Sequence, residues 1–244
     1  MKNKNEIRRF TFAALAGVMM MASPAYAQDD ENDPMESINR GVFAFNQVVD
    51  DYLVGPVAKS YRYVTPDELR SRIGNVSDNL MEPLNMVNSF LQGDFQRGMK
   101  SFWRFVLNST VGIGGMNDVA ASAGIERQNE DFGQTLAVWG VGEGPYIVLP
   151  ILGPSSLRDT AGLATDWFIN PVNYAIDDTN TEIWVALARG LVQRERLIDV
   201  LDDVNETSLD PYVTLRSMYR QHRAAQIRNM GDGPLPSSGD SDSN

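Results

Sequence analysis

The chain has 244 residues, a net charge of −11, one histidine and no cysteine. The negative charge disfavours nucleic acid as a partner, because phosphate binding needs clustered lysines and arginines. Disulfides, thiol catalysis and thiolate metal sites are excluded. Only carboxylate clusters remain as metal ligands, and the adjacent acidic pairs are better explained as solvated charge. We therefore expect no metal and no cofactor.

The first 27 residues are typical of a secretory signal peptide. Basic residues in 2–9 precede an apolar run at 10–22, and Ala25-Tyr26-Ala27 supplies an A-x-A cleavage signal. A membrane anchor is the alternative, but the run is too short for a bilayer core of ~30 Å. At the other end, residues 229–244 are rich in Gly, Pro, Ser and Asp, which predicts a disordered tail. Residues 28–228 then form one folded domain.

Helix signals dominate the first half of that domain. Thr65–Glu68 is a capping box with proline at the first helical position, and a second helix begins at Pro83 and stops at Gly93. Asp94 is placed to cap a third helix. Its apolar face is broad and aromatic, with Phe95, Phe102, Trp103, Val106 and Leu107.

The second half shows the same pattern. Thr179–Glu182 is another capping box, and Asp210-Pro211 starts the last helix. The helix after Thr179 has an apolar stripe made of Trp184, Leu187, Leu191, Ile198 and Leu201. Because period-two strand patterns are nearly missing, we predict an all-α fold interrupted by Gly/Pro-rich loops at 112–115 and 140–154.

Catalytic chemistry has little support. A Ser-His-Asp site would have to use His222, near the end of the last predicted helix, but a solvated surface histidine is the favoured interpretation. The glycines at 112–115 lack the Gly-Lys-Ser/Thr of a phosphate loop, so a helix end and turn explain them better. We predict that the chain is not an enzyme.

The apolar stripes are compatible with two environments. Stripes at helical spacing usually form an ordinary core, but the same geometry suits helices that lie in a membrane interface. The segment 43–53, with aromatic residues at both ends and no charge before Asp50, is one example. Periodicity alone does not separate these two interpretations.

The segment Glu143–Asp159, "EGPYIVLPILGPSSLRD", has no charge between its first residue and Arg158. It is as apolar as a membrane span, yet three prolines and Gly153 prevent a continuous helix. An apolar, non-helical stretch of this length needs a functional explanation.

Five segments are distinctive: "DPMESINRGVFAFN" (33–46), "NLMEPLNMVNSFLQGD" (79–94), "RFVLNSTVGIGGMNDVA" (104–120), "EDFGQTLAVWGVGEGPYIVLPILGPSSLRD" (130–159) and "LDPYVTLRSMYRQHR" (209–223). Together they closely resemble the MlaA (VacJ) family of outer-membrane phospholipid-transport proteins. The resemblance runs from Asp33 to about Ile227. Its string G-V-G-x-G-P-Y…L-P…G-P-S…R-D is long and unusual.

The resemblance implies a ring-like helical domain with a central channel, seated in the periplasmic leaflet of the Gram-negative outer membrane beside a trimeric porin. The channel would admit phospholipids mislocalised to the outer leaflet and pass them to a soluble periplasmic carrier, which maintains lipid asymmetry. The alternative is a structural porin-associated protein without its own lipid passage. A lipid hydrolase is disfavoured by the single histidine.

The resemblance also assigns candidate site residues. The hairpin and channel set has Gly140, Gly142 and Gly144 as hinge, Tyr146, Ile147, Leu149 and Leu152 as apolar lining, and Pro145 and Pro150 beside them. Phe43, Phe45 and Asn46 match the start of the family's N-terminal amphipathic helix, where we place membrane seating and control of lipid entry. The alternatives are a rigid buried loop and ordinary helix packing.

One departure concerns attachment to the membrane. Many members of the family are lipoproteins whose signal peptide ends at a lipid-modified cysteine, whereas this signal ends at Ala25-Tyr26-Ala27 and the sequence holds no cysteine. We therefore expect an exported protein that is not lipidated, held by the apolar perimeter of its helices and by partners.

Overall fold

The computed structural model describes residues 33–176 and 178–228. The predicted signal peptide and the predicted tail both lie outside the described residues. In this range the chain is mostly helical, with one short two-stranded sheet.

The elements follow in chain order. The first group is α2 (Glu36–Val49), the π-helical turn η1 (Asp50–Val54), α3 (Gly55–Val64), α4 (Asp67–Asn79), α5 (Glu82–Leu91), α6 (Phe95–Thr110), α7 (Val119–Ser122) and α8 (Phe132–Val138). The second is β1 (Tyr146–Leu149), β2 (Gly153–Ser156), α9 (Leu157–Ile169), α10 (Val172–Ala175), α11 (Thr179–Arg196), α12 (Ile198–Thr207) and α13 (Pro211–Ile227).

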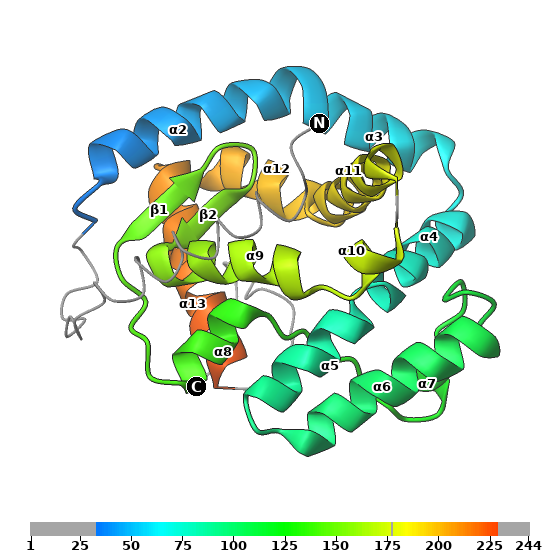
Figure 1. The fold of residues 1–244 in the computed structure, drawn as a ribbon. Coiled ribbons are helices and arrows are strands. Elements are labelled where there is room, and N and C mark those ends of the chain that lie inside the picture. Colours follow the sequence, from blue (N-terminus) through cyan, green and yellow to red (C-terminus); the bar gives the residue numbers. More distant parts are fainter. Residues whose placement is uncertain (1–32, 177, 229–244) are drawn as a thin grey trace, which may run out of the picture.

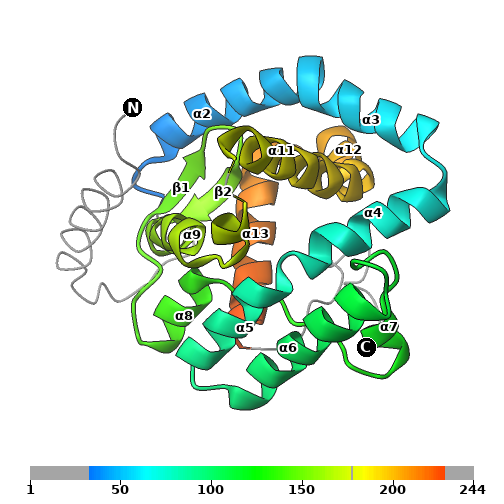
Figure 2. The same cartoon turned by 45° about the vertical axis from the view of Figure 1, so that its right-hand side comes forward.

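One long arc borders the molecule. In Figure 1, α2, η1 and α3 run along the upper edge without a break, and the chain then turns back into α4. The paired helices α5 and α6 lie at the opposite edge, while the hairpin and α9 lie beneath α2 (Figures 1 and 2). Helix α11 packs against α3 and α4, so the second half of the chain contacts the first half at this end of the arc.

The prediction of an all-α fold is wrong at one place. β1 and β2 pair antiparallel, with Tyr146 opposite Ser156 and Leu149 opposite Gly153. Each strand has only four residues, too few to show a period-two pattern, and the second carries a proline. The prediction that prolines and glycine keep this segment non-helical is confirmed.

Helix starts are confirmed where an aspartate supplies the cap. The side chain of Asp94 accepts a hydrogen bond from the backbone N–H of Arg97 at the start of α6. Asp210 accepts from the N–H groups of Tyr212 and Val213 at the start of α13. The predicted stop at Gly93 is also confirmed, since this residue has a φ of 82° after α5.

The two predicted threonine capping boxes are wrong by one residue. The carbonyl of Pro66 accepts the first intrahelical bond of α4, so Pro66 caps this helix and Thr65 lies outside it. At α11 the cap is Asp178, whose carboxylate accepts from the N–H of Thr181. An aspartate one residue earlier takes the role that the box pattern gave to Thr179.

The polarity of the molecule is inverted relative to an ordinary globular domain. Among the described residues, 23 polar or charged side chains are buried against 11 hydrophobic ones, while 32 large hydrophobic side chains are exposed. Soluble monomers rarely expose apolar surface on this scale. The surface of this protein therefore suits an apolar surrounding, and its interior has to be held by polar contacts.

Helix α6 shows the inversion most clearly. Its aromatic stripe, which includes Phe95, Phe102 and Trp103, is exposed. The buried stripe is polar or small, with Gly98, Ser101, Arg104 and Asn108 at three- and four-residue spacing. The structure thus decides between the two environments for this stripe: it is not core. None of the described helices has the length and apolarity needed to cross a membrane.

Buried ion pairs join the inward faces of the helices. The side chain of Arg104 is 2% exposed and lies 2.7 Å from carboxylate oxygens of both Glu82 and Asp118. It thereby ties α6 to the start of α5 and to the cap of α7. Removing one partner of such a pair leaves an uncompensated buried charge, which costs about 3–5 kcal/mol.

A second junction is a single buried carboxylate. Asp166 of α9 accepts the N–H of Phe132 with both oxygens, at 3.1 and 3.0 Å, and the side-chain amide of Asn88 at 2.9 Å. Burial raises the pKa of Asp166 to about 7, and Asp131 adds to this, although the hydrogen bonds and the charge of Arg223 act to lower it. Three helices, α5, α8 and α9, therefore meet at a group that is hard to ionise.

The Asp166 junction predicts a pH dependence of stability. Its pKa is raised from an ordinary 3.8 to about 7. The folded state therefore keeps a proton that the unfolded chain releases, so its contribution is present below pH 3.8 and is lost as pH rises to 7. The loss is on the order of 4 kcal/mol.

The measurement compares urea unfolding in detergent of the wild type and Asp166→Asn, which does not titrate. We expect the free energy of unfolding of the wild type, minus that of the variant, to fall from about pH 4 to pH 7 and to be flat above. A difference that stays constant over this range would contradict the assignment.

Candidate functional site

The hairpin presents two different faces. Along β1, Tyr146 and Val148 are buried while Ile147 and Leu149 are partly exposed, as the alternation of a strand requires. The buried pair packs with Tyr212 of α13. The tip, which includes Ile151 and Leu152, is exposed and apolar.

Two asparagines of α2 clamp the edge of β1. The amide of Asn39 donates to the carbonyl of Tyr146 at 3.0 Å and accepts the N–H of Val148 at 2.9 Å. The amide of Asn46 donates to the carbonyl of Leu149 at 2.9 Å and accepts the N–H of Ile151 at 2.7 Å. Seven residues separate the two asparagines, which places them on one face of α2. The helix thus replaces a third strand.

The inner clamp is fixed from behind. Asn39 is buried and also donates a hydrogen bond to Asp33, and the carboxylate of Asp33 accepts a hydrogen bond from the hydroxyl of Tyr212. Arg216 forms an ion pair with the same carboxylate. Phe43 packs edge-on against Tyr212, with ring centroids 5.6 Å apart. The start of α2, the hairpin and α13 therefore form one packed unit.

The outer clamp has less support. Asn46 is only partly buried, and Ile151, which it holds, is exposed with a φ of 67°. A left-handed conformation is unfavourable for a β-branched residue. The tip is thus held in a strained turn by one side-chain amide, so it is the weaker end of the hairpin.

Ionic contacts hold the base of the hairpin. β2 ends at Ser156, whose hydroxyl caps α9 through the N–H of Asp159. Both oxygens of Asp159 accept from Arg223 of α13, at 2.8 and 2.9 Å, and Arg223 also binds Asp131. Burial acts to raise the pKa of Asp159, but Arg223 outweighs it and lowers the pKa to about 2. The base is therefore charged and fixed at neutral pH.

The predicted hinge glycines differ from one another. Gly140 and Gly144 have φ values of 89° and 71°, which favour glycine, whereas Gly142 lies outside the left-handed region. At Gly144 an added Cβ would lie 3.1 Å from Cβ of Leu157. Their role as a hinge stays a prediction.

The other predicted residues fall into distinct places. Tyr146 is 1% exposed and part of the core, whereas Ile147, Leu149 and Leu152 retain exposed surface. Of the proposed seating residues, Phe45 is exposed; Phe43 packs on Tyr212, and Asn46 holds the hairpin. Asn39 and Arg223 were not among the predicted site residues. The seven-residue spacing of two asparagines in one amphipathic helix was the available signal for the first.

Potential catalytic or metal-binding groups are dispersed. His222 makes no hydrogen bond or ion pair with another described residue, and it is partly exposed on α13. In the described ranges, no group of three or more His, Asp or Glu side chains is arranged to hold a metal ion. The turn at 112–115 follows α6, with Gly114 and Gly115 at positive φ, which confirms its interpretation as a helix end.

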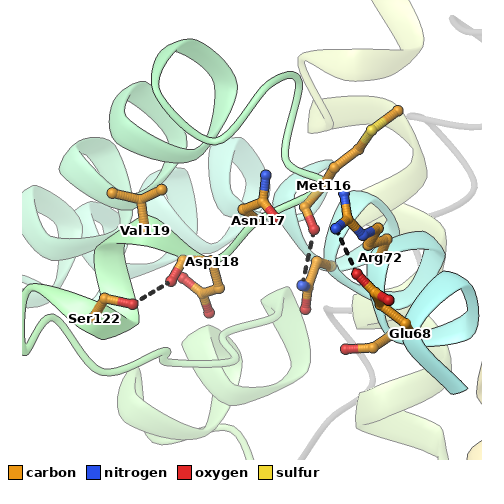
Figure 3. A pocket seen from close by; sticks show the side chains of 9 residues that line it. Glu68, Arg72, Met116, Asn117, Asp118, Val119 and Ser122 are labelled. Carbon is orange, nitrogen blue, oxygen red and sulfur yellow. Dashed lines mark hydrogen bonds and ion pairs between the residues drawn. The ribbon is translucent and has the colours of Figure 1, made fainter.

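A shallow, open cavity of about 330 Å³ lies elsewhere, between α4 and the connection from α6 to α7 (Figure 3). On one wall, the guanidinium of Arg72 forms an ion pair with the carboxylate of Glu68 at 2.7 Å. Met116, Asn117 and Asp118 form the other wall. Its lining is mainly polar and it does not include the hairpin. It therefore does not explain the apolar segment.

The clamp geometry makes a prediction about mobility. Asn46→Ala removes both contacts of the hairpin tip, so amide exchange in 149–152 should accelerate by about tenfold, the effect of losing one to two net hydrogen bonds. Hydrogen–deuterium exchange measures this. Asn75→Ala is the control, because Asn75 also bonds one loop carbonyl, that of Met116, but far from the hairpin. Equal exchange at the tip in both variants would show that Asn46 does not hold it.

Comparisons with known proteins agree on one family. Residues 31–226 match the family described as "MlaA lipoprotein". The intermembrane phospholipid transport system lipoprotein MlaA of Escherichia coli is 38% identical over 230 residues, covering 92% of this chain and 90% of that protein. An uncharacterised protein of Rickettsia prowazekii is 39% identical over 197 residues, covering 80% of this chain and 78% of that protein.

A solved structure gives the same result. It was reported as the structural basis for maintenance of bacterial outer membrane lipid asymmetry, and it superimposes with a TM-score of 0.70 at 39% identity. The match covers 81% of this chain and 100% of the other. The chain belongs to the MlaA family of phospholipid-transport lipoproteins.

Proposed function

We propose that this protein is the outer-membrane component of an intermembrane phospholipid transport system and maintains outer-membrane lipid asymmetry. It acts as a conduit and not as an enzyme. Membership of the MlaA family supports this function, and the inverted polarity is the structural observation that carries it. An exterior of exposed aliphatic and aromatic side chains with a polar interior suits a protein that lies among lipids and handles their head groups.

The physical need for a conduit follows from the acyl chains. Exposing two chains of about sixteen carbons to water costs roughly 0.8 kcal/mol per CH₂, on the order of 25 kcal/mol in all. Rapid passive movement therefore requires a sheltered route with an apolar side for the chains and a polar side for the head group. In the proposal, the helices surround this route as a ring.

The hairpin is the proposed movable wall of that route. Ile147, Leu149 and Leu152 contribute apolar surface, and Gly140 and Gly144 allow the approach to β1 to bend. The clamp at Asn46 supports this division, because it holds the tip through a single amide while the Asp159–Arg223 pair fixes the base. Asn46 then controls opening from α2.

Membrane seating is assigned to the apolar perimeter. All four tryptophans have exposed side chains: Trp103 (49%), Trp139 (53%), Trp167 (56%) and Trp184 (70%). Tryptophan prefers the membrane–water interface. The proposal seats the chain in the periplasmic leaflet by this perimeter and by a trimeric porin, without an acylated cysteine. A soluble periplasmic carrier takes the lipid onward.

Tryptophan exposure gives a direct test of seating. Brominated phospholipids quench tryptophans that they touch, so vesicles containing them should quench most of the emission of the bound protein, since all four side chains reach the surface. Vesicles of unbrominated phospholipid are the control. Quenching no greater than that of free tryptophan added to the same vesicles would contradict a membrane-facing perimeter.

The conduit itself is tested by locking the hairpin. Asn46→Cys with Ile151→Cys joins two positions already in contact, and the chain has no cysteine to compete. We expect the oxidised double variant to lose transfer of labelled phospholipid from vesicles to the carrier, and dithiothreitol to restore it. The single variant Ile151→Cys should transfer at the wild-type rate under both conditions, and the single variant Asn46→Cys, which lacks the clamp but forms no intramolecular disulfide, should not lose transfer on oxidation.

The outcomes separate the candidate functions. Full transfer by the oxidised form would show that no hairpin motion is needed. Absence of transfer by the wild type, with normal binding to the porin, would favour the alternative of a structural porin-associated protein without its own passage.

A further inference from the structure

Most basic side chains of this protein are neutralised by a carboxylate. Lys59 pairs with Asp202 and Arg62 with Glu195, each at 2.7 Å, and Arg104 pairs with Glu82 at the same distance. Such groups have little positive charge left for an external anion. A site for an anionic ligand requires a cation without this compensation.

Arg189 of α11 is such a cation. Its side chain is partly buried, and no carboxylate of the described chain lies within ion-pair distance of it. One guanidinium nitrogen contacts the sulfur of Met81, and Nε is enclosed without any hydrogen-bond partner. Burial is the main influence on its pKa and lowers it. Retaining an enclosed, uncompensated arginine is unfavourable for stability alone.

The surroundings of Arg189 add positive charge. The charge of Asp78 of α4 acts on Arg189, but Arg127 already lies 2.6 Å from one oxygen of this carboxylate, and Arg196 donates to both oxygens, at 2.9 and 3.0 Å. Asp78 is therefore already paired with two guanidinium groups, and Arg189 lies beyond ion-pair distance of it. Nε of Arg127 is also enclosed without a partner. The cluster has more donors and more positive charge than the protein satisfies.

The position of this cluster suits a lipid. Helix α11 packs against α3 and α4 and lies below the α2–α3 arc in Figure 2. Ala186 and Val185, three and four residues before Arg189, lie on the same side of α11 and retain exposed apolar surface. An amphipathic ligand whose anionic end reaches Arg189 would thus find apolar side chains beside it.

We propose that Arg189, together with Arg127 and Arg196, binds a phosphate group where α4, the start of α5 and α11 meet, and that this phosphate is the head group of a phospholipid. The assignment rests on the proposed function and deepens it by naming a head-group site. The planar guanidinium matches the geometry of phosphate oxygens. A bound phosphate would also supply the counter-charge that Asp78 alone does not.

The test uses the full-length protein in detergent with three probes: dihexanoylphosphatidylethanolamine, inorganic phosphate and dihexanoylglycerol. Arg189→Met keeps the length of the side chain but removes its charge. We expect it to weaken phospholipid binding by about tenfold, the effect of losing one charged hydrogen-bond partner. Binding of dihexanoylglycerol should not change. Arg228→Met is the matched control, because Arg228 is exposed and forms no ion pair with a described carboxylate.

Stability gives a second readout that does not depend on lipid. Without ligand, Arg189→Met should unfold at a higher temperature than the wild type, because it removes an enclosed charge. Arg189→Lys, which keeps the charge but not the planar fork, should bind with intermediate affinity. This variant keeps the test valid if the methionine variant folds poorly.

Each outcome bears on the proposal. Undiminished phospholipid binding by Arg189→Met, or an equal loss in Arg228→Met, would overturn it. Inorganic phosphate that binds as tightly as the phospholipid would identify a free-anion site and overturn the head-group assignment. If the wild type and Arg189→Met transfer lipid equally and bind it equally, this inference fails while the proposed conduit stands. If the wild type itself transfers no phospholipid to the carrier, the proposed conduit function is rejected instead.

Discussion

The fold depends on the pairing of charged and polar side chains that its inverted polarity places inside. Because so many large apolar side chains face outward, burial of the protein's own apolar surface supplies less of its stability than in a soluble domain of this size. Polar groups taken from water then need partners inside the protein, since each unmatched one costs free energy. Arg104 with its two carboxylates and Arg223 with Asp131 and Asp159 show how closely this is done.

The same inversion explains how one short hairpin combines a fixed base with a weakly held tip. Interior charges are available near α9 and α13, so the base is held by ion pairs that resist opening. At the tip, only the amide of Asn46 connects α2 to the backbone of the hairpin. Hydrogen bonds of this kind contribute about 1 kcal/mol each, so they can be exchanged for contacts with a ligand. A movable end on a rigid scaffold is what a gated lipid route needs.

A polar interior has a further consequence for a protein that handles phospholipids. The apolar parts of such a ligand can be covered by the outward-facing aromatic and aliphatic side chains, but its phosphate needs donors and positive charge. Most arginines are occupied by carboxylates that hold the fold together. Arg189 has no such carboxylate, and its neighbours Arg127 and Arg196 share Asp78. This cluster therefore has positive charge available for a phosphate.

The sequence by itself determined where α6 and α13 begin and that residues 143–156 are not helical, because capping by Asp94 and Asp210 and the covalent restriction of proline are local. It also located the aromatic stripe of α6, but not its direction. Periodicity shows that a helix has an apolar side and a polar side, but it does not show which side packs against the rest of the protein. Pairing of the hairpin with α2, burial of Tyr146 and the lack of a carboxylate for Arg189 depend on residues far apart in the chain. Only the tertiary structure decided these, because side-chain partners are set by how the helices pack.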